Sequence, residues 1–424
     1  MSTDLDISAI MRSFASRPLL FERVKGSSLP VAGNLYSTRQ SLSFALGLKP
    51  EEDVTKFIEN ASKDPSSAVG HVEKFDSSSW DYNGDVDLSK LPILKHYDNE
   101  AGHYITAGII VAKGSGTSEN LSFHRMLVLS KNELTARIVS RHLDRIARDS
   151  KERKIPITIL IGPPPAVFVS ASLQIQYGVS EYKIANKMSE GALDLSTSEK
   201  SDILFPADTE VVLEGLLDYS RNAKEGPFVD LTQTYDDVRE QPLIRVERIH
   251  YRKDSVYQAI LAGSSEHALF MGLPQEVKIR EALAKSIPKV RGVNLTSASE
   301  GYFHCIVSIE KTNDGDGKTA ILNCLAASHP LKIVIVVDSD TDPFNLSDVE
   351  WALATRFQAS KGLVVIEGAK GSSLDPSSGK SAVTSKLGLD ATLPIQADRS
   401  KFNRASISTS ERTRAIIDSL GSKQ

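Results

Sequence analysis

The sequence predicts a mixed fold of helices and strands in three successive parts. Helical and strand-like apolar patterns alternate in the first quarter of the chain, strand-like patterns dominate the middle, and the alternation returns near residue 266. A chain of 424 residues is long enough for two or three domains. We therefore expect an α/β domain at residues 1–98, a β-rich domain at 99–260 and a second α/β domain at 261–424.

The first part opens with a predicted helix. Apolar residues recur at helical spacing from Ile7 to Phe14, behind the candidate N-cap Asp6. Further elements are predicted as strands at residues 19–24 and 29–36, helices at 38–48 and 51–62, and a polar connection at 76–84.

The middle part consists mainly of strand-length apolar runs. Strands are predicted at residues 104–112, 125–129, 135–139, 157–161, 211–217, 244–251 and 255–261. Shorter helical pieces are predicted at residues 142–149, 170–176 and 185–188. Many short strands in one segment are typical of a barrel or a sandwich.

The last part returns to alternating helices and strands. Helices are predicted at 277–284 and 346–356, and strands at 302–310, 332–337 and 361–367. Residues 368–381, rich in glycine and serine, form a predicted long loop. An amphipathic helix at 410–420 packs either on a neighbouring subunit or on its own body.

Composition narrows the class of protein. A net charge of −4 is not typical of a nucleic-acid-binding domain, and no apolar run is long enough to span a membrane. The N-terminus is acidic where a secretory signal would be basic. The only cysteines, Cys305 and Cys324, have no metal-binding spacing, which fits a reducing compartment, so we expect a cytoplasmic protein.

Two carboxylates flank a stiff turn in the middle part. Glu225 and Asp230 stand on either side of Gly226 and Pro227, residues that interrupt helices and form turns. Two carboxylates in unlike environments can divide acid and base roles between them. The alternative is an acidic turn in contact with water.

Three further residues supply candidate metal ligands. Asn120 offers an amide oxygen, His142 an imidazole that could equally be a capping group, and Glu181 a carboxylate that could equally favour a helix N-terminus. Together they suit Mg²⁺ or Mn²⁺ with open coordination positions, and not a structural zinc site. Arg125, close to Asn120, offers a planar fork for a carboxylate or a phosphate.

Two segments in the last part of the chain resemble ligand-binding motifs only in part. Lys386 could contact a phosphate, although the Gly-x-x-x-x-Gly-Lys pattern of a phosphate-binding loop is absent. Residues 338–342 imitate the start of a calcium loop, but Pro343 and Val349 occupy positions that require glycine and glutamate. We expect a helix entry at that point.

These segments together resemble one protein family. The motifs that carry the resemblance are Asn120-x-x-x-x-Arg125, His142, Ser180-Glu181-Tyr182, Pro206-Ala207-x-x-Glu210-x-x-Leu213-Glu214-Gly215, Glu225-Gly226-Pro227-Phe228-x-Asp230 and Ser385-Lys386-x-Gly388-Leu389-Asp390-Ala391-Thr392. In this order they are similar to the UbiD family of decarboxylases that depend on prenylated FMN. The resemblance covers residues 100–395.

The resemblance implies an architecture and a set of partners. The middle part would be a split β-barrel that binds prenylated FMN, and the last part an oligomerisation domain with a terminal helix, giving a dimer or a hexamer. A separate flavin prenyltransferase would supply the cofactor. Mn²⁺ (or Mg²⁺) and K⁺ would hold the cofactor phosphate.

The resemblance also implies residue roles. Asn120, His142 and Glu181 match the metal ligands. Arg125, Glu225 and Asp230 match the catalytic set, with Arg125 gripping the substrate carboxylate, Glu225 tuning Arg125 and Asp230 donating a proton. The residues expected around the cofactor are Asn120, Ser122, Phe123, His124, Arg125, His142, Glu181 and Lys386. His124 either contacts a polar substrate or faces solvent.

The implied substrate is a small unsaturated carboxylic acid. The compact first part is similar to the archaeal-type branch of the family, which points to decarboxylation of trans-anhydromevalonate 5-phosphate to isopentenyl phosphate in isoprenoid biosynthesis. One alternative is an aromatic acid such as a 4-hydroxy-3-polyprenylbenzoate. Another is a flavin-binding or assembly subunit without activity, against which the intact Arg125, Glu225 and Asp230 set argues.

Overall fold

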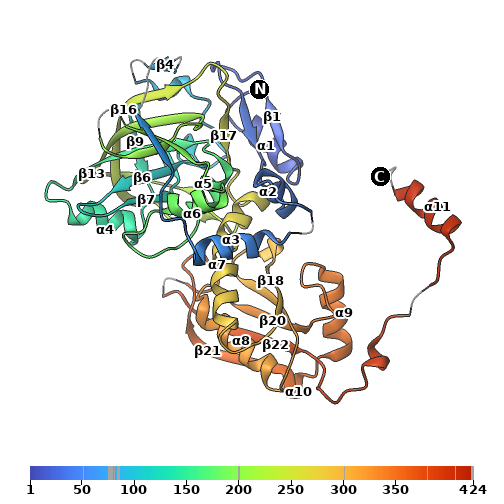
Figure 1. The fold of residues 1–424 in the computed structure, drawn as a ribbon. Helices are drawn as coiled ribbons and strands as arrows, with labels where there is room; N and C mark the ends of the chain where they lie inside the picture. The colour runs from blue at the N-terminus through green and yellow to red at the C-terminus, as the bar shows by residue number, and fades with distance from the viewer. Residues whose placement is uncertain are drawn as a thin grey trace.

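A computed structural model describes residues 1–50, 52–74, 80, 82–83, 86–198, 201–299, 301–379, 381–405 and 407–421. It has a β-rich body formed by the first and middle parts of the chain, a smaller α/β body, and a C-terminal segment that extends away from both (Figure 1). The predicted mixed α/β fold is confirmed. Most of the connection predicted at 76–84 lies outside the described residues.

The first part forms a small sheet flanked by helices. Its elements are α1 (Asp6–Ser13), β1 (Leu19–Phe21), β2 (Val31–Gly33), α2 (Arg39–Ala45) and α3 (Val54–Lys63). The third strand of this sheet, β17 (Tyr257–Ala259), comes from far along the chain and runs parallel to β2. The strand predicted at 255–261 is therefore present, at residues 257–259, and it pairs with a strand of the first part of the chain.

The middle part forms one nine-stranded sheet that curls into a half-barrel (Figure 1). Its main path, in spatial order, is β5 (Tyr104–Ile105), β8 (Met126–Val128), β9 (Glu133–Ala136), β16 (Arg239–Tyr251), β13 (Val211–Glu225), β10 (Lys154–Ile161), β6 (Ile109–Lys113) and β7 (Glu119–Phe123), with β4 (Tyr82–Asn83) on β16. The strand predicted at 104–112 is two strands. The chain passes so close to Met126 at Gly108 that a Cβ there would meet the Met126 methyl group at 2.2 Å.

Short helices and a small sheet cover this half-barrel. They are α4 (His142–Asp149), α5 (Pro165–Ser170), α6 (Glu181–Met188), and a sheet of β12 (Leu204–Pro206), β11 (Asp194–Thr197) and β3 (His71–Lys74). The helix predicted at 170–176 is wrong in position, because Pro164 and Pro165 begin α5 earlier.

Alternate residues of the long strands enter two different cores. Val211 and Leu213 of β13 pack in one apolar cluster, whereas Val212 between them packs in the other, with Phe168 of α5 and Tyr182 of α6. This two-residue period is what a strand with both faces covered requires. It holds the sheet rigid between its two cores.

The last part forms a five-stranded sheet with helices. In spatial order its strands are β18 (Val290–Leu295), β19 (His304–Ile309), β20 (Ile333–Asp338), β22 (Val383–Ala391) and β21 (Leu363–Lys370), and its helices are α7 (Ser265–Leu283), α8 (Asp316–Ala327), α9 (Leu346–Arg356) and α10 (Ala359–Gly362). Helix α7 begins twelve residues before the predicted 277–284 helix, since Ser264 caps it and the helix continues through the buried Pro274.

A buried ion cluster anchors α9 to this sheet. Asp338, at the end of β20, accepts hydrogen bonds from Arg356 at 3.0 Å, Arg399 at 3.2 Å and the Leu393 backbone at 2.8 Å. Arg356 also binds Asp340. The acidic segment at residues 338–342, which imitates a calcium loop, therefore forms ion pairs with arginines and leads into α9.

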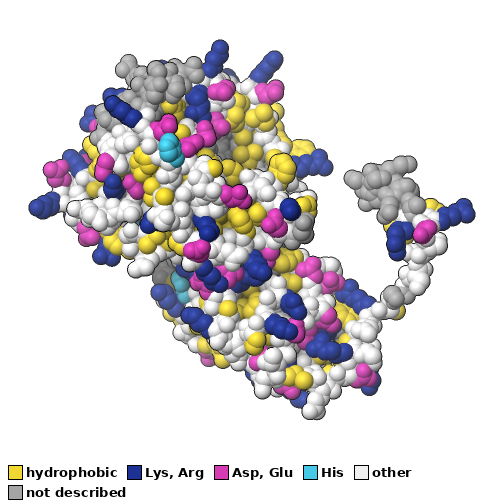
Figure 2. Space-filling view, in the orientation of Figure 1, with side chains coloured by type: hydrophobic (Ala, Val, Ile, Leu, Met, Phe, Trp, Pro, Cys, Tyr) yellow, Lys and Arg dark blue, Asp and Glu magenta, His cyan; other side chains and the backbone are white. Residues whose placement is uncertain are grey.

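The C-terminal segment contains η4 (Arg399–Phe402) and α11 (Glu411–Gly421). Its first part contacts the α/β body, where Arg399 binds Asp338 and Arg404 binds Asp348. Helix α11 stands clear of the two bodies in Figures 1 and 2, and Ile407, Ile416 and Ile417 are exposed. Acidic and basic side chains are interspersed over the visible face of the molecule (Figure 2). Among the helices of the described ranges, none combines the length and apolar character needed to cross a membrane.

Candidate active site

The candidate site lies at the tip of the longest hairpin of the half-barrel. Glu225, the last residue of β13, pairs with Arg239, the first residue of β16. The intervening loop carries two short paired strands, β14 (Phe228–Val229) and β15 (Tyr235–Asp236). The Glu225 side chain is fully buried and that of Asp230 is 20% exposed, so this is not an acidic surface turn.

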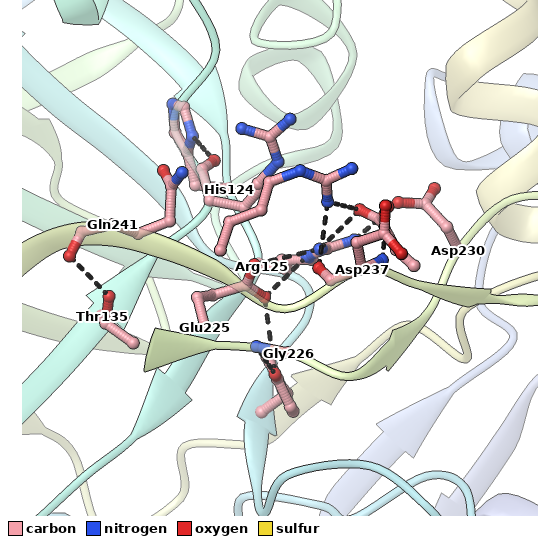
Figure 3. Close-up of polar contacts among 12 residues, drawn as sticks. His124, Arg125, Thr135, Glu225, Gly226, Asp230, Asp237 and Gln241 are labelled. Carbon is pink, nitrogen blue, oxygen red and sulfur yellow. Dashed lines mark hydrogen bonds and ion pairs between the residues drawn. The ribbon is translucent and has the colours of Figure 1, made fainter. Parts of the chain in front are cut away.

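Arg125, which directly precedes β8, lies among three carboxylates. Its Nε and Nη2 donate to the two oxygens of Glu225 at 2.9 and 3.0 Å. Nη1 donates to Asp230 at 2.6 Å, and Nη2 also donates to Asp236 at 3.0 Å (Figure 3). The contacts expected of Arg125 with Glu225 and Asp230 are present.

This arrangement leaves little of the Arg125 guanidinium free. Of its five N–H groups, four are engaged: one on Nε, two on Nη2 and one on Nη1. A bidentate grip on a substrate carboxylate, as expected from the sequence, therefore requires Asp230 or Asp236 to withdraw.

The three carboxylates do not have the same surroundings. Glu225 is bound by two N–H groups of Arg125 and lies near the Tyr104 hydroxyl. Asp236 is shared between Arg125 and Arg239, at 3.0 and 2.5 Å. Asp230 receives one arginine N–H and the Leu231 backbone N–H. Asp230 is thus the most exposed of the three and has the fewest arginine contacts.

The electrostatics follow from these contacts. Burial lowers the pKa of Arg125, but Glu225, Asp230 and Asp236 outweigh burial and raise it above its ordinary value, so the guanidinium stays charged. Burial raises the pKa of Asp236, but Arg239 and Arg125 together bring it below its usual range. Asp236 is therefore a permanent anion at neutral pH.

Two aromatic rings pack against the Arg125 cluster. Arg125 lies over the ring of Phe228 at 4.7 Å, and Phe228 packs on Tyr104 with ring centres 4.5 Å apart. The Tyr104 hydroxyl lies 3.4 Å from Glu225 and accepts from the Gly226 N–H at 3.1 Å. Gly226 has a φ of 95°, which disfavours other residues, and a Cβ there would meet the Asp237 carbonyl at 3.1 Å.

His124 is buried, so the expectation that it faces solvent was wrong. Its Nδ1 lies 2.9 Å from the Arg137 carbonyl and its Nε2 2.9 Å from the Ser122 hydroxyl. Since a carbonyl only accepts, Nδ1 carries the proton and Nε2 accepts from Ser122. Burial lowers the pKa of His124 to about 4, so the ring is neutral.

Asn120 and Glu181, two of the expected metal ligands, lie together. Asn120 Nδ2 and the Leu121 backbone donate to the Glu181 oxygens at 3.0 and 2.9 Å. Burial raises the pKa of Glu181 to about 8, and the buried Oδ1 of Asn120 has no hydrogen-bond partner. A desolvated carboxyl group beside an unpartnered amide oxygen is a donor set that fits a divalent cation.

The other expected cofactor residues are placed separately. The His142 ring contacts Tyr177 edge-on at 5.3 Å and makes no hydrogen bond to Asn120 or Glu181. Phe123 packs on Phe168 at 4.7 Å. Within the ranges that the structure describes, no group of three or more His, Cys, Asp or Glu side chains could hold a metal ion.

Lys386 lies in the last part of the chain. Its Nζ donates to the carbonyls of His329 and Leu331 at 2.8 and 2.9 Å, and the side chain is buried. In this arrangement Lys386 joins β22 to the connection between α8 and β20 and does not belong to the Arg125 cluster.

Sequence reasoning missed four residues of the cluster: Tyr104, Phe228, Asp236 and Arg239. Phe228 stood inside the quoted motif without a role. The other three have no local signal, since Tyr104, Asp236 and Arg239 reach the cluster from other strands. The Glu225–Arg239 register could be expected only from a hairpin that extends β13 to Glu225.

Comparison with known proteins matches nearly the whole chain to one family. Three models of 3-octaprenyl-4-hydroxybenzoate carboxy-lyase match: the N-terminal domain at residues 1–61, the Rift-related domain at 72–265 and the C-terminal domain at 268–391. The chain belongs to the UbiD family. It is therefore a member of a family of decarboxylases, and the predicted resemblance is confirmed.

Similar proteins include two archaeal enzymes named anhydromevalonate phosphate decarboxylase. The one from Methanothermobacter thermautotrophicus is 40% identical over 96% of this chain and 95% of its own length, and the one from Aeropyrum pernix is 39% identical over 90% and 86%. Among solved structures, the UbiD-class enzyme HmfF from Pelotomaculum thermopropionicum, in complex with FMN, has a TM-score of 0.91 at 31% identity, covering 96% of this chain and 92% of that one.

Proposed function

We propose that this UbiD-family protein uses prenylated FMN to decarboxylate trans-anhydromevalonate 5-phosphate to isopentenyl phosphate. The observation that carries the proposal is the buried Arg125 cluster with Glu225 and Asp230, in a chain 40% identical to an archaeal enzyme of that name. A structure of HmfF in complex with prenylated FMN, similar to this chain with a TM-score of 0.87, supports the cofactor.

The chain's own residues would orient the acid and move one proton. When bound, prenylated FMN supplies an electron sink for the carbon that loses CO₂. Arg125 would hold the substrate carboxylate once Asp230 or Asp236 withdraws from it, and Glu225 would keep Arg125 oriented. Asp230, the most accessible of the three acids, would deliver the proton to the carbon that has lost CO₂.

We further propose that a divalent cation, Mn²⁺ or Mg²⁺, together with K⁺, holds the cofactor phosphate. The unpartnered Asn120 oxygen beside Glu181 supports this, with His142 as the third ligand after a movement of its ring. His142→Ala should lower bound manganese by elemental analysis. Lys386→Met, by contrast, should leave manganese content unchanged, because the Lys386 amine binds two backbone carbonyls.

We propose the following domain organisation and assembly for the chain. Residues 1–98, 99–260 and 261–424 would be the N-terminal domain, the split barrel that binds the flavin, and the oligomerisation domain. Exposed isoleucines on the C-terminal segment support a homo-oligomer, a dimer or a hexamer. A flavin prenyltransferase would supply the cofactor, and the two buried free cysteines fit a cytoplasmic protein.

The direct test measures CO₂ release by protein produced together with a flavin prenyltransferase. The phosphorylated unsaturated acid should be turned over, and aromatic acids such as 4-hydroxybenzoates should not. If aromatic acids were turned over and the phosphorylated acid were not, the proposed substrate would be wrong, but the proposed decarboxylation would stand. Absence of a modified flavin spectrum in fully loaded protein would reject the cofactor.

A further inference from the structure

One end of the half-barrel gathers three arginines from neighbouring strands. The strands β8, β9, β16 and β13 are adjacent in the sheet. Arg125 precedes β8, Arg137 follows β9, and Arg239 begins β16 opposite Glu225. The Arg137 N–H donates to the Arg125 carbonyl at 3.1 Å, so these two residues are direct neighbours across the sheet.

Arg137 differs from the other two arginines in its contacts. Arg125 binds three carboxylates and Arg239 binds Asp236. The Arg137 side chain makes one long hydrogen bond, from Nη1 to the Ile138 carbonyl at 3.4 Å, and has no carboxylate partner within the described ranges of the chain. Burial, with the charges of Arg239 and Arg125, lowers the pKa of Arg137 from its ordinary value. Asp236 and Glu225 act on Arg137 from a distance and raise its pKa in part. A half-buried cation without a carboxylate in contact costs free energy that an incoming anion would recover.

The backbone around Arg137 is held firmly while its side chain is not. The carbonyl of Arg137 accepts from the His124 ring at 2.9 Å, and the next N–H, of Ile138, donates to the Gln241 side chain at 2.8 Å. His124 is itself held by Ser122. The Arg137 backbone is thus fixed, whereas its guanidinium makes one long hydrogen bond, to the Ile138 carbonyl.

The position of Arg137 favours the substrate over the cofactor phosphate. Arg137 is hydrogen-bonded to the backbone of Arg125, whereas Asn120 of the proposed cation site stands near the start of β7, five residues before Arg125. Arg125 has one N–H left for a ligand, so a substrate with two anionic groups needs a second cation nearby.

We propose that Arg137 binds the phosphate group of the substrate and thereby selects phosphorylated unsaturated acids. This inference rests on the proposed function and names the residue that recognises its substrate. The planar guanidinium matches a phosphate with two parallel N–H···O bonds, which lysine cannot reproduce. Arg137 is accordingly a specificity residue, and Arg125 with Asp230 remains the reactive group.

The test compares Arg137→Gln and Arg137→Lys in flavin-loaded protein. Arg221→Gln is the matched control, since Arg221 belongs to the same sheet, is largely exposed and binds Glu133. With the phosphorylated acid, Arg137→Gln should raise KM at least about tenfold at nearly unchanged kcat, the effect of losing a charged hydrogen bond. Arg137→Lys should restore part of the loss, and the unphosphorylated hydroxy acid should be insensitive to either change.

Three results would overturn the proposal: an unchanged KM in Arg137→Gln, an equal loss with both acids, or loss of the flavin spectrum. Calorimetry separates this inference from the proposed function. Isopentenyl phosphate should bind wild-type loaded protein more tightly than isopentenol does, and Arg137→Gln should remove that difference. This holds even if the acid is not turned over; equal binding of the two ligands to wild-type protein would also overturn it.

Discussion

The two bodies of the molecule each contain a buried arginine with several carboxylates, and the two clusters are built differently. In the α/β body, Arg356 and Arg399 form ion pairs with Asp338 and Asp340, so two cations face two anions. At the barrel edge, Arg125 and Arg239 serve Glu225, Asp230 and Asp236, two cations for three anions. The α/β cluster thus has one arginine for each acid, whereas the barrel cluster has one more acid than it has arginines in ion pairs, and the proposed proton donor Asp230 belongs to the latter.

The largest expected effect is on activity at the barrel cluster. Glu225→Gln and Asp230→Asn should each lower kcat about 10²–10⁴-fold, since each removes a charged group at the reacting carboxylate. Flavin binding should stay near wild type, and thermal stability should fall more in Glu225→Gln, whose carboxylate is fully buried, than in Asp230→Asn. Asp237→Asn is the matched control, because the Asp237 side chain is exposed beside the same cluster. Wild-type CO₂ release in both variants would remove the carboxylates from the mechanism.

Substitutions in the Asp338–Arg356 cluster of the α/β body should lower the stability of the protein. Asp338→Asn leaves Arg356 buried with a weaker partner and should destabilise the α/β body by about 3–5 kcal/mol. Trp351, on α9 near Arg356, reports this unfolding in a Trp80→Phe background. Asp340→Asn should do far less, as Asp340 is half exposed. Equal effects of the two changes would show that burial of the pair does not matter.

A third kind of buried carboxylate has no arginine at all. Glu266, on α7, accepts the Tyr36 N–H at 2.8 Å, and burial raises its pKa to about 7. A raised pKa stabilises the fold below the unfolded value of about 4.5, and this contribution is lost as pH rises towards 7.

Glu266→Gln should therefore remove part of the pH dependence of stability. The free energy of unfolding of wild type minus that of Glu266→Gln should fall by on the order of 3 kcal/mol between pH 4.5 and pH 8. Urea unfolding at both pH values measures it. A difference that does not change with pH would mean that Glu266 is ionised throughout.

The smallest expected effect is on the kcat of a variant at Asp236, the third carboxylate around Arg125. Asp236→Asn removes one anion from Arg125 and the partner of Arg239, and should lower kcat about tenfold without loss of flavin. Because Asp236 orients Arg125 without touching the substrate, KM should change less than kcat. An effect as large as that of Asp230→Asn would make Asp236 a direct participant.

Local patterns were sufficient for some elements and insufficient for others. Helices α4 and α9 occupy the predicted residues, because amphipathic spacing marks both their ends. Helix α7 was cut short at Pro274, a residue that normally ends a helix but is buried inside this one. The partner of β2 could not be inferred, since strand pairing over more than 200 residues leaves no local pattern.

The same division applies to the site. Arg125, Glu225 and Asp230 could be named from motifs because each stands in a recognisable segment. Asp236 and Arg239 could not, because their roles depend on the hairpin register and on the folding of the loop between β13 and β16. That the Arg137 guanidinium has no carboxylate in contact among the described residues can be known only from the partners of its neighbours.

The pairing of β17 with β2 has a consequence for synthesis. The first strands of the chain obtain their third strand from residues 257–259, and Tyr36 obtains its acceptor from Glu266, 230 residues later. At a translation rate of 5–20 residues per second, the N-terminal sheet waits roughly ten to forty seconds on the ribosome with one edge open. An isolated N-terminal fragment lacks that strand altogether, so it cannot complete this sheet.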